Sequence, residues 1–186
     1  VHAEAFFQVN TAQAAQISRT LLEWSTGLPT AAKVWDIYGG TGTLGLGFAE
    51  AGQEVTVVER SRDSAAYGKM QAELNGLSDR YTFVEGDAAN EVPRLVQDAG
   101  RPDLVITDPP RQGLAPAVID ALLEAQAPQW LYVSCDPATL ARDVKRILAG
   151  GYELARWQVY DLFPWTGHVE TVVLLSHQLI KKDILI

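Results

Sequence analysis

Short apolar runs alternate with longer segments of helical periodicity from residue 12 of this 186-residue chain onward. Apolar runs bounded by turn residues are typical of buried strands, and apolar positions that recur every three or four residues are typical of helices packed on a sheet. The pattern predicts strands over residues 33–38, 55–59, 81–85, 104–107 and 130–134, and helices over residues 12–26, 43–51, 63–75, 89–99, 116–126 and 139–148. Such alternation predicts an α/β fold with a mostly parallel sheet.

The last part of the chain departs from this alternation. Residues 152–160 and 169–176 both have the pattern of strands, and no clear helical segment lies between them. Strands joined without a crossover helix pair antiparallel. We therefore expect an antiparallel C-terminal hairpin at the edge of the sheet.

A glycine-rich loop follows the first predicted strand. Gly40, Gly42 and Gly45 form a Gly-x-Gly-x-x-Gly pattern, and the second predicted strand ends at Glu59. Glycines let a ligand approach the backbone of a tight turn, and an acid at the end of the second strand can hold ribose hydroxyls. A dinucleotide and an adenosyl cofactor both satisfy this pattern, as does a tight turn without a ligand. Asp87, just past the third strand, could meet an adenine amino group or cap the helix that follows.

The single cysteine, Cys135, lies where the fifth predicted strand gives way to a helix. Ligands of open α/β sheets collect beyond the carboxyl ends of the strands, so a thiol at this junction is placed to face a substrate. Asp136 is expected to cap the helix and Pro137 to be its first residue, and the positive end of the helix dipole then favours the thiolate. The alternative is a buried cysteine that acts as a small apolar side chain.

A second loop, in which Asp108 precedes two prolines, follows the fourth predicted strand. The prolines fix their own φ angles and disfavour helix at the preceding residue, so Asp108 is held on a stiff loop. A carboxylate or backbone carbonyl fixed there can bond the amide edge of a planar base. A rigid turn without a catalytic role is the alternative.

Composition narrows the classes of function. The net charge of -8 argues against a strong nucleic-acid surface on this chain, because phosphate binding depends on lysine and arginine. Arg142, Lys145 and Arg146 share one helix face and, like Lys181 and Lys182, are interpreted as solvated charges. No apolar run approaches the roughly 18 residues of a membrane span. We therefore expect no membrane partner. One cysteine can form neither an internal disulfide nor a cysteine cluster for zinc or iron, so we also expect a cytoplasmic protein without a metal.

Five motifs occur in a fixed order along the chain. They are Phe-x-Gln-Val-Asn at residues 6–10, Asp-x-Tyr-x-Gly-x-Gly at 36–42, Asp-Pro-Pro-Arg-x-Gly at 108–113, Ser-Cys-Asp-Pro-x-Thr-x-x-Arg-Asp at 134–143 and His-Val-Glu at 168–170. With this set the chain resembles the RNA uracil-5-methyltransferase family, specifically its catalytic domain. The resemblance implies a class I methyltransferase fold with a Rossmann-like sheet, formed by residues 1–186 as one domain. It also implies S-adenosylmethionine (SAM) as the cofactor and RNA, either tRNA or rRNA, as the substrate.

The resemblance further implies roles for individual residues. Cys135 is implied as the nucleophile and Glu170 as the base. The residues that match cofactor-pocket or active-site positions are Gln8, Tyr38, Thr43, Glu59, Asp87 and Asp108. Relatives often carry asparagine at the position of Thr43 and cysteine at that of Gly39. The family's usual amino-terminal RNA-binding region, where some relatives hold an iron–sulfur cluster, is expected to be absent from this chain, so most of the RNA affinity is expected to lie outside it.

The implied chemistry has to activate carbon 5 of uracil, which is a poor nucleophile. Addition of the Cys135 thiolate to carbon 6 pushes electrons onto carbon 5, which takes the methyl group, and Glu170 accepts the proton that then leaves. The base must also leave any stack. Three alternatives remain open: an amino-group methyltransferase that uses the Asp-Pro-Pro loop, although Arg111 stands where such enzymes have an aromatic residue; an NAD(P)-binding oxidoreductase; and an inactive cofactor-binding module.

Overall fold

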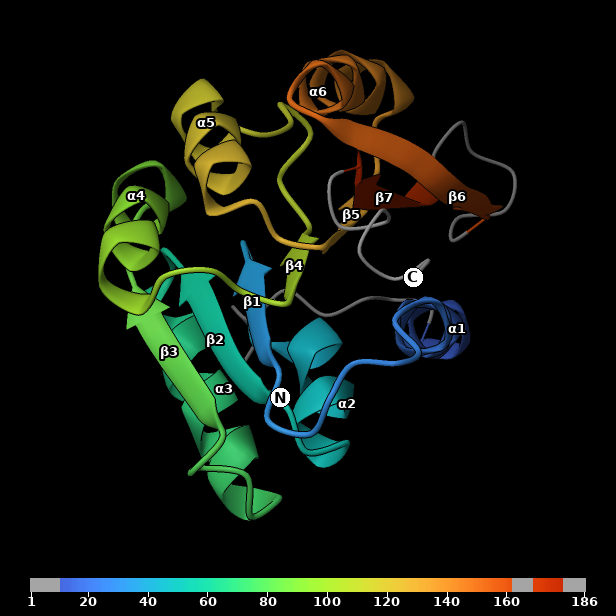
Figure 1. Ribbon diagram of the computed structural model, residues 1–186. Coiled ribbons are helices and arrows are strands. Elements are labelled where there is room, and N and C mark those ends of the chain that lie inside the picture. The colour runs from blue at the N-terminus through green and yellow to red at the C-terminus, as the bar shows by residue number, and fades with distance from the viewer. Residues whose placement is uncertain (1–10, 162–168, 179–186) are drawn as a thin grey trace.

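The computed structural model describes residues 11–161 and 169–178 and shows one twisted sheet with helices on both faces (Figure 1). The strands are β1 (Lys33–Ile37), β2 (Glu54–Glu59), β3 (Tyr81–Glu85), β4 (Leu104–Thr107), β5 (Gln129–Ser134), β6 (Tyr152–Tyr160) and β7 (Glu170–His177). The helices in these ranges are α1 (Thr11–Trp24), α2 (Thr43–Glu50), α3 (Arg62–Leu74), α4 (Ala88–Ala99), α5 (Pro116–Ala125) and α6 (Pro137–Ala149). All predicted elements are present, each within two residues of its expected bounds.

The seven strands lie in the order β3-β2-β1-β4-β5-β7-β6. The first five pair in parallel, whereas β7 runs antiparallel to both β5 and β6. The hairpin therefore inserts its second strand beside β5 and leaves β6 at the edge. The expected α/β sheet, mostly parallel with an antiparallel C-terminal hairpin, is confirmed.

Two apolar cores lie on opposite faces of the sheet. The larger includes Trp35, Trp130 and Tyr132 and is covered by residues of α4, α5 and α6. The second core packs under α1, α2 and α3, with Leu21 and Phe48 among its fully buried side chains. Because strands buried on both faces read as continuous apolar runs, this arrangement explains the short apolar segments of the sequence.

Strand periodicity gathers the candidate site groups on one face. The second core contains Val34, Val57, Ile106, Val133 and Val172, one from each of five strands. Two residues further toward the carboxyl edge of the parallel strands stand Asp36, Glu59, Asp108, Cys135 and Glu170. Side chains two residues apart in a strand share a face, so these five groups line the same edge on the side of α1–α3.

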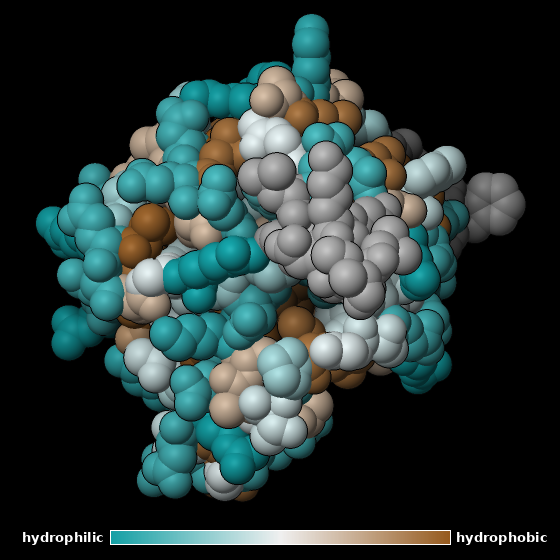
Figure 2. Space-filling model, in the orientation of Figure 1, coloured by the Kyte–Doolittle hydropathy of each residue, from teal (hydrophilic) through white to brown (hydrophobic). Residues whose placement is uncertain are grey.

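The face of the molecule that is turned to the viewer in Figure 2 is largely polar. Hydrophilic residues predominate on the face seen in Figure 2, and hydrophobic residues show only as small separate patches. Among the described residues, none of the helices is both long and apolar enough to cross a bilayer.

Candidate active site

The glycine-rich loop is held by the carboxylate of Glu59. The backbone N–H of Gly40 donates to Glu59 Oε2 at 2.9 Å, and that of Ser61 donates to Oε1 at 2.6 Å. A carboxylate has about four lone-pair sites. Glu59 therefore fixes the loop and keeps further acceptor capacity, and its role toward ribose hydroxyls stays a prediction.

Two further side chains, those of Tyr81 and Asp36, form hydrogen bonds with the backbone of the loop and of the start of α2. The Tyr81 hydroxyl, from β3, donates to the carbonyl of Gly42, and the backbone N–H of Gly45 donates to Asp36 Oδ2 at 3.1 Å. Asp36 is fully buried and its Oδ1 has no hydrogen-bond partner in the described part of the chain. Desolvation, with a smaller effect of the Glu59 charge, raises the pKa of Asp36 to about 7. We did not single out this carboxyl from the sequence, although an acid inside an apolar strand was a usable signal.

Two glycines of the loop offer a direct test of the geometry. Both have positive φ, +59° at Gly40 and +79° at Gly42, but a Cβ at Gly40 meets nothing within 4 Å, whereas a Cβ at Gly42 would lie 2.5 Å from the Tyr81 hydroxyl. We expect Gly40→Ala to lower the free energy of unfolding by about 1 kcal/mol through backbone strain, and Gly42→Ala by about 2–4 kcal/mol because overpacking adds to it. Urea denaturation measures both. Equal losses in the two variants would contradict the close approach of Tyr81.

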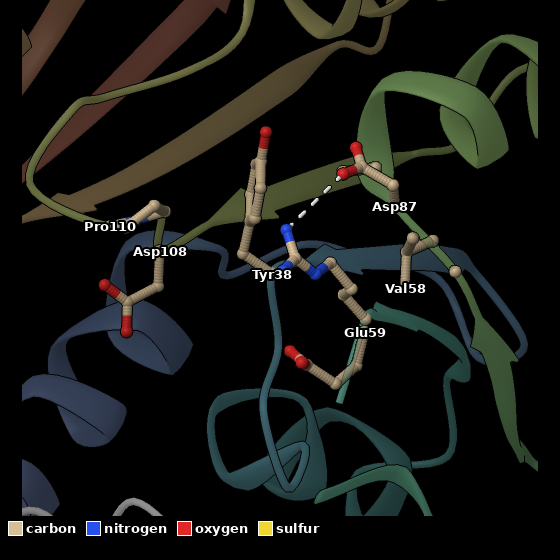
Figure 3. A pocket seen from close by; sticks show the side chains of 9 residues that line it. Tyr38, Val58, Glu59, Asp87, Asp108 and Pro110 are labelled. Atoms are coloured by element: carbon tan, nitrogen blue, oxygen red, sulfur yellow. Dashed lines mark ion pairs between the residues drawn. The ribbon is translucent and has the colours of Figure 1, made fainter. Parts of the chain in front are cut away.

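A cleft of about 300 Å³ opens beside this loop, at the carboxyl ends of β1, β2, β3 and β4 (Figure 3). Its walls are formed by Tyr38, Val58, Glu59, Arg60, Gly86, Asp87, Ala88, Asp108 and Pro110. Four of the predicted cofactor residues thus meet in one cavity. Thr43 is not among the lining residues; it opens α2, exposed, with its hydroxyl 3.0 Å from that of Thr41. Gln8 lies outside the described residues.

Tyr38 reaches the cleft through an unusual backbone conformation. Its φ is +63°, a value that costs energy for a residue with a Cβ and that turns the side chain out of the strand alternation. The ring stands between Asp108 and Asp87 in Figure 3 and packs on the core under α4–α6. The sequence pattern predicted strand through residue 38 and gave no sign of this turn.

Asp87 fulfils the capping alternative and also lines the cleft. Its Oδ1 accepts from the backbone N–H of Ala89 at 2.9 Å as the N-cap of α4, and its Oδ2 lies 3.9 Å from Arg60 Nη1. Figure 3 shows this ion pair across the cleft. Because Arg60 and Asp87 are both largely exposed, the pair contributes little to stability, and Arg60 is free to reorient toward a ligand.

Cys135 lies at the predicted junction of strand and helix. Asp136 Oδ1 accepts from the backbone N–H groups of Ala138 and Thr139, and Pro137 is the first residue of α6. The thiol is partly exposed rather than sealed in a core. The expected lowering of the thiol pKa is wrong as a net effect: burial, followed by the charges of Glu170 and Asp108, raises it, while Arg111 opposes the shift.

Glu170 lies near Cys135, since its charge acts on the thiol. The β5–β7 ladder ends with the pair of Ser134 and Thr171, and Cys135 and Glu170 are the residues that follow and precede that pair in the two strands. Glu170 is 7% exposed, and its Oε2 has no hydrogen-bond partner among the described residues. Burial raises the pKa of Glu170 to about 7. The pairing brings together the nucleophile and the base implied by the sequence.

Asp108 links this pair to the cleft. Its backbone N–H donates to the carbonyl of Ile37 at 3.3 Å, which extends the β1–β4 pairing by one residue. Desolvation, then the charges of Glu170 and Asp36, raise the pKa of Asp108 to about 8. The mutual influence of these carboxyls indicates a continuous acidic site that runs from the glycine loop to the thiol. In the described part of the chain, no group of three His, Cys, Asp or Glu side chains could hold a metal ion.

The sequence of the chain is similar to those of known RNA methyltransferases. The family model of tRNA (uracil-5-)-methyltransferases matches residues 2–178. An uncharacterized RNA methyltransferase of Thermosynechococcus vestitus is 45% identical over 173 residues, which are 92% of this chain and 37% of that protein. One of Clostridium acetobutylicum is 37% identical over 176 residues, which are 95% of this chain and 38% of that protein.

Among solved structures, the Pyrococcus abyssi tRNA (uracil-54, C5)-methyltransferase in complex with S-adenosyl-L-homocysteine superposes with a TM-score of 0.81 at 31% identity. The match covers 95% of this chain and 41% of that one, so the chain spans about two fifths of the proteins that it matches. Residues 2–178, matched by the family model, include the glycine loop, the Asp-Pro-Pro loop, Cys135 and Glu170. The chain belongs to the tRNA (uracil-5-)-methyltransferase family.

Proposed function

We propose that this chain transfers a methyl group from SAM to carbon 5 of a uridine in RNA, through a covalent adduct between Cys135 and carbon 6. The observation that carries the proposal is that Cys135 and the buried carboxyl of Glu170, whose Oε2 has no hydrogen-bond partner among the described residues, lie near each other just beyond the last pair of the β5–β7 ladder, at the edge that also bears the cleft. A thiol paired with an acid at a sheet's carboxyl edge suits addition followed by proton abstraction.

The residues that line the cleft suit the polar groups of SAM. Glu59 has lone pairs for ribose hydroxyls, Asp87 offers a carboxylate to the adenine amino group, and the Tyr38 ring forms a wall. Bound SAM supplies an electrophilic methyl group on a positively charged sulfur. The carboxyls of Asp36, Asp108 and Glu170 all have raised pKa values, so a cation beside them is favoured and would lower those values.

Within this proposal each residue has one task. Cys135 Sγ bonds to carbon 6, and the electron pair of the 5,6 double bond moves onto carbon 5 and its adjoining carbonyl. Carbon 5 uses that pair to take the methyl group. Glu170 then removes the proton from carbon 5, the double bond reforms, and the bond between Sγ and carbon 6 breaks to release Cys135 as a thiolate. A base with a pKa near 7 is matched to this task at neutral pH.

RNA as the substrate is supported by the names of the relatives, and tRNA in particular by the Pyrococcus protein. The charge of -8 gives this chain little attraction for phosphates, so a weak intrinsic RNA affinity is part of the proposal. The uridine and the class of RNA are decided by assay on tRNA and rRNA transcripts.

The test uses transcripts that contain 5-fluorouridine, whose carbon 5 has no proton to lose. With SAM present, we expect an RNA–protein adduct that survives denaturation and maps by mass spectrometry to Cys135, and no adduct with Cys135→Ala. The assay is run with the chain as printed and with any longer protein that contains it. Methylation of an exocyclic nitrogen without an adduct would instead support the amino-group alternative, and binding of NAD(H) in preference to SAM the oxidoreductase.

A further inference from the structure

The Asp-Pro-Pro loop and the first turns of α6 are tied together by three hydrogen bonds. The Thr139 hydroxyl donates to the carbonyl of Arg111 at 3.1 Å, and Arg142 Nη2 donates to the carbonyl of Gln112 at 2.8 Å. In the other direction, the backbone N–H of Leu114 donates to Asp143 Oδ2 at 2.8 Å. Helix α6, which begins beside Cys135, therefore forms hydrogen bonds with three of the four residues 111–114.

Gly113 shows how closely the loop approaches the helix. Its φ is +75°, and a Cβ at this position would lie 2.5 Å from Asp143 Oδ2 and 2.6 Å from Arg142 Nη2. Only glycine combines this backbone conformation with so little space. The last glycine of the Asp-Pro-Pro-Arg-x-Gly motif is thus explained by contact with the last two residues of the Ser-Cys-Asp-Pro motif.

The buried carboxylate of Asp143 stabilises this contact between the loop and α6. Asp143 is 1% exposed, and in addition to Leu114 it accepts from the Tyr132 hydroxyl at 2.8 Å and from Arg142 Nε at 2.8 Å. A buried carboxylate with this many donors has a fixed orientation. Arg142 is consequently held between Asp143 and the Gln112 carbonyl, although more than half of its side chain is exposed.

The loop held in this way carries a charge that acts on the thiol. Arg111 favours the thiolate of Cys135, in opposition to Glu170 of β7 and to Asp108 at the start of the same loop. Asp136, the remaining charged group next to the thiol, is engaged in capping α6. Among the described charges that act on Cys135, Arg111 is the one that favours the thiolate, and the Thr139 hydroxyl holds its carbonyl against the first turn of α6.

We infer that Arg142 is a positioning residue, which fixes the loop through the Gln112 carbonyl and so keeps Arg111, whose own carbonyl is bound by Thr139 in the first turn of α6, in place near Cys135. The inference rests on the proposed function only for the role of the thiolate as a nucleophile. The reactivity of the Cys135 thiol can be measured without RNA or SAM, because Cys135 is the only cysteine of the chain.

The experiment is the pH dependence of alkylation by iodoacetamide, followed by mass spectrometry. In Arg142→Ala we expect the midpoint to rise by roughly 0.5–1 pH unit, which lowers the alkylation rate at neutral pH about three- to tenfold. Arg146→Ala is the matched control: Arg146 lies one turn further along α6, is comparably exposed, and pairs with Asp120 of α5 instead of the loop. Its midpoint is expected to equal that of the unaltered protein.

Two further variants separate positioning from a general loss of structure. Arg111→Ala should raise the midpoint at least as much as Arg142→Ala, and the double variant should add nothing to Arg111→Ala, because both act through one charge. Arg142→Lys keeps the charge but lacks the planar guanidinium fork that bonds Asp143 and the Gln112 carbonyl in a fixed geometry, so an intermediate midpoint is expected. An unchanged midpoint in Arg142→Ala, an equal shift in Arg146→Ala, or full additivity with Arg111→Ala would each overturn the inference. These outcomes are independent of whether RNA is methylated, so failure of the proposed function is detected separately by the 5-fluorouridine assay.

Discussion

Replacing Cys135 with alanine is expected to abolish methyl transfer while leaving cofactor binding intact. Loss of a covalent nucleophile typically removes about four or more orders of magnitude from kcat, since no other group can replace its bond to the substrate. The cleft is lined by residues at the ends of β1, β2, β3 and β4, and Cys135 is not one of them. Transfer of tritiated methyl groups from SAM to RNA measures the first effect, and calorimetric titration with S-adenosylhomocysteine the second.

Cys135→Ser is the companion variant, because it keeps the size of the side chain and replaces the thiolate by a much weaker nucleophile. We expect it to be as inactive as Cys135→Ala. A rate within tenfold of the unaltered protein in either variant would exclude the covalent route and favour methyl transfer to an exocyclic nitrogen, which needs no thiol. Loss of S-adenosylhomocysteine binding together with activity would instead mean that the substitution had disturbed the fold.

The fold was largely predictable because the pattern on which it depends is local. A strand buried on both faces has to be continuously apolar, and a helix that covers a sheet has to be amphipathic, so elements such as β4 and α5 are visible within a few residues. The antiparallel hairpin was predicted for the same reason. The insertion of β7 between β5 and β6 was not, because strand order depends on contacts between distant segments.

The candidate site was predictable as a set of residues but not as a geometry. Cys135 and Glu170 are 35 positions apart, and only the pairing of β5 with β7 brings them near each other. The positive φ of Tyr38 is likewise invisible to a strand pattern. The thiol pKa was expected to fall on the evidence of the helix terminus alone, since the sequence did not reveal that Glu170 and Asp108 lie close enough to outweigh it.

Side chains that act through partners on other elements were missed. Asp36 supports the glycine loop through Gly45, and Asp143 is buried among donors from β5, α6 and the Asp-Pro-Pro loop. In the sequence they are acids in a strand and on a helix, with nothing to show their partners. Arg142 was interpreted as a solvated charge, which describes its exposure but omits its bonds to Gln112 and Asp143.

The burial of Glu170 also predicts how stability depends on pH. Its pKa rises from 4.5 to about 7 on folding, so the folded chain binds this proton more tightly than the unfolded chain does. The resulting contribution to the free energy of unfolding is fully present below pH 4.5 and is lost as the pH rises through about 7. Asp36 and Asp108 act in the same direction. Urea denaturation at pH 5 and pH 8 should therefore show a smaller decline with pH in Glu170→Gln than in the unaltered protein.

Glu170→Gln is expected to stop the reaction after methyl transfer and before release. The amide cannot accept the proton from carbon 5, so the methylated base stays bonded to Cys135, and turnover falls by about 10²–10⁴-fold. In the unaltered protein the release step requires the ionised carboxylate, so its rate should rise about tenfold per pH unit below 7 and level off above it. A denaturing gel with ordinary uridine RNA detects the trapped adduct. Glu54→Gln is the control, because Glu54 is exposed at the amino-terminal end of β2, away from the carboxyl edge of the sheet. This variant should release its product normally. Normal release by Glu170→Gln would assign proton removal to another group, as would a release rate that falls while the pH approaches 7 from below. Asp108 is then the first candidate, because its charge acts on Cys135 and it is itself influenced by Glu170.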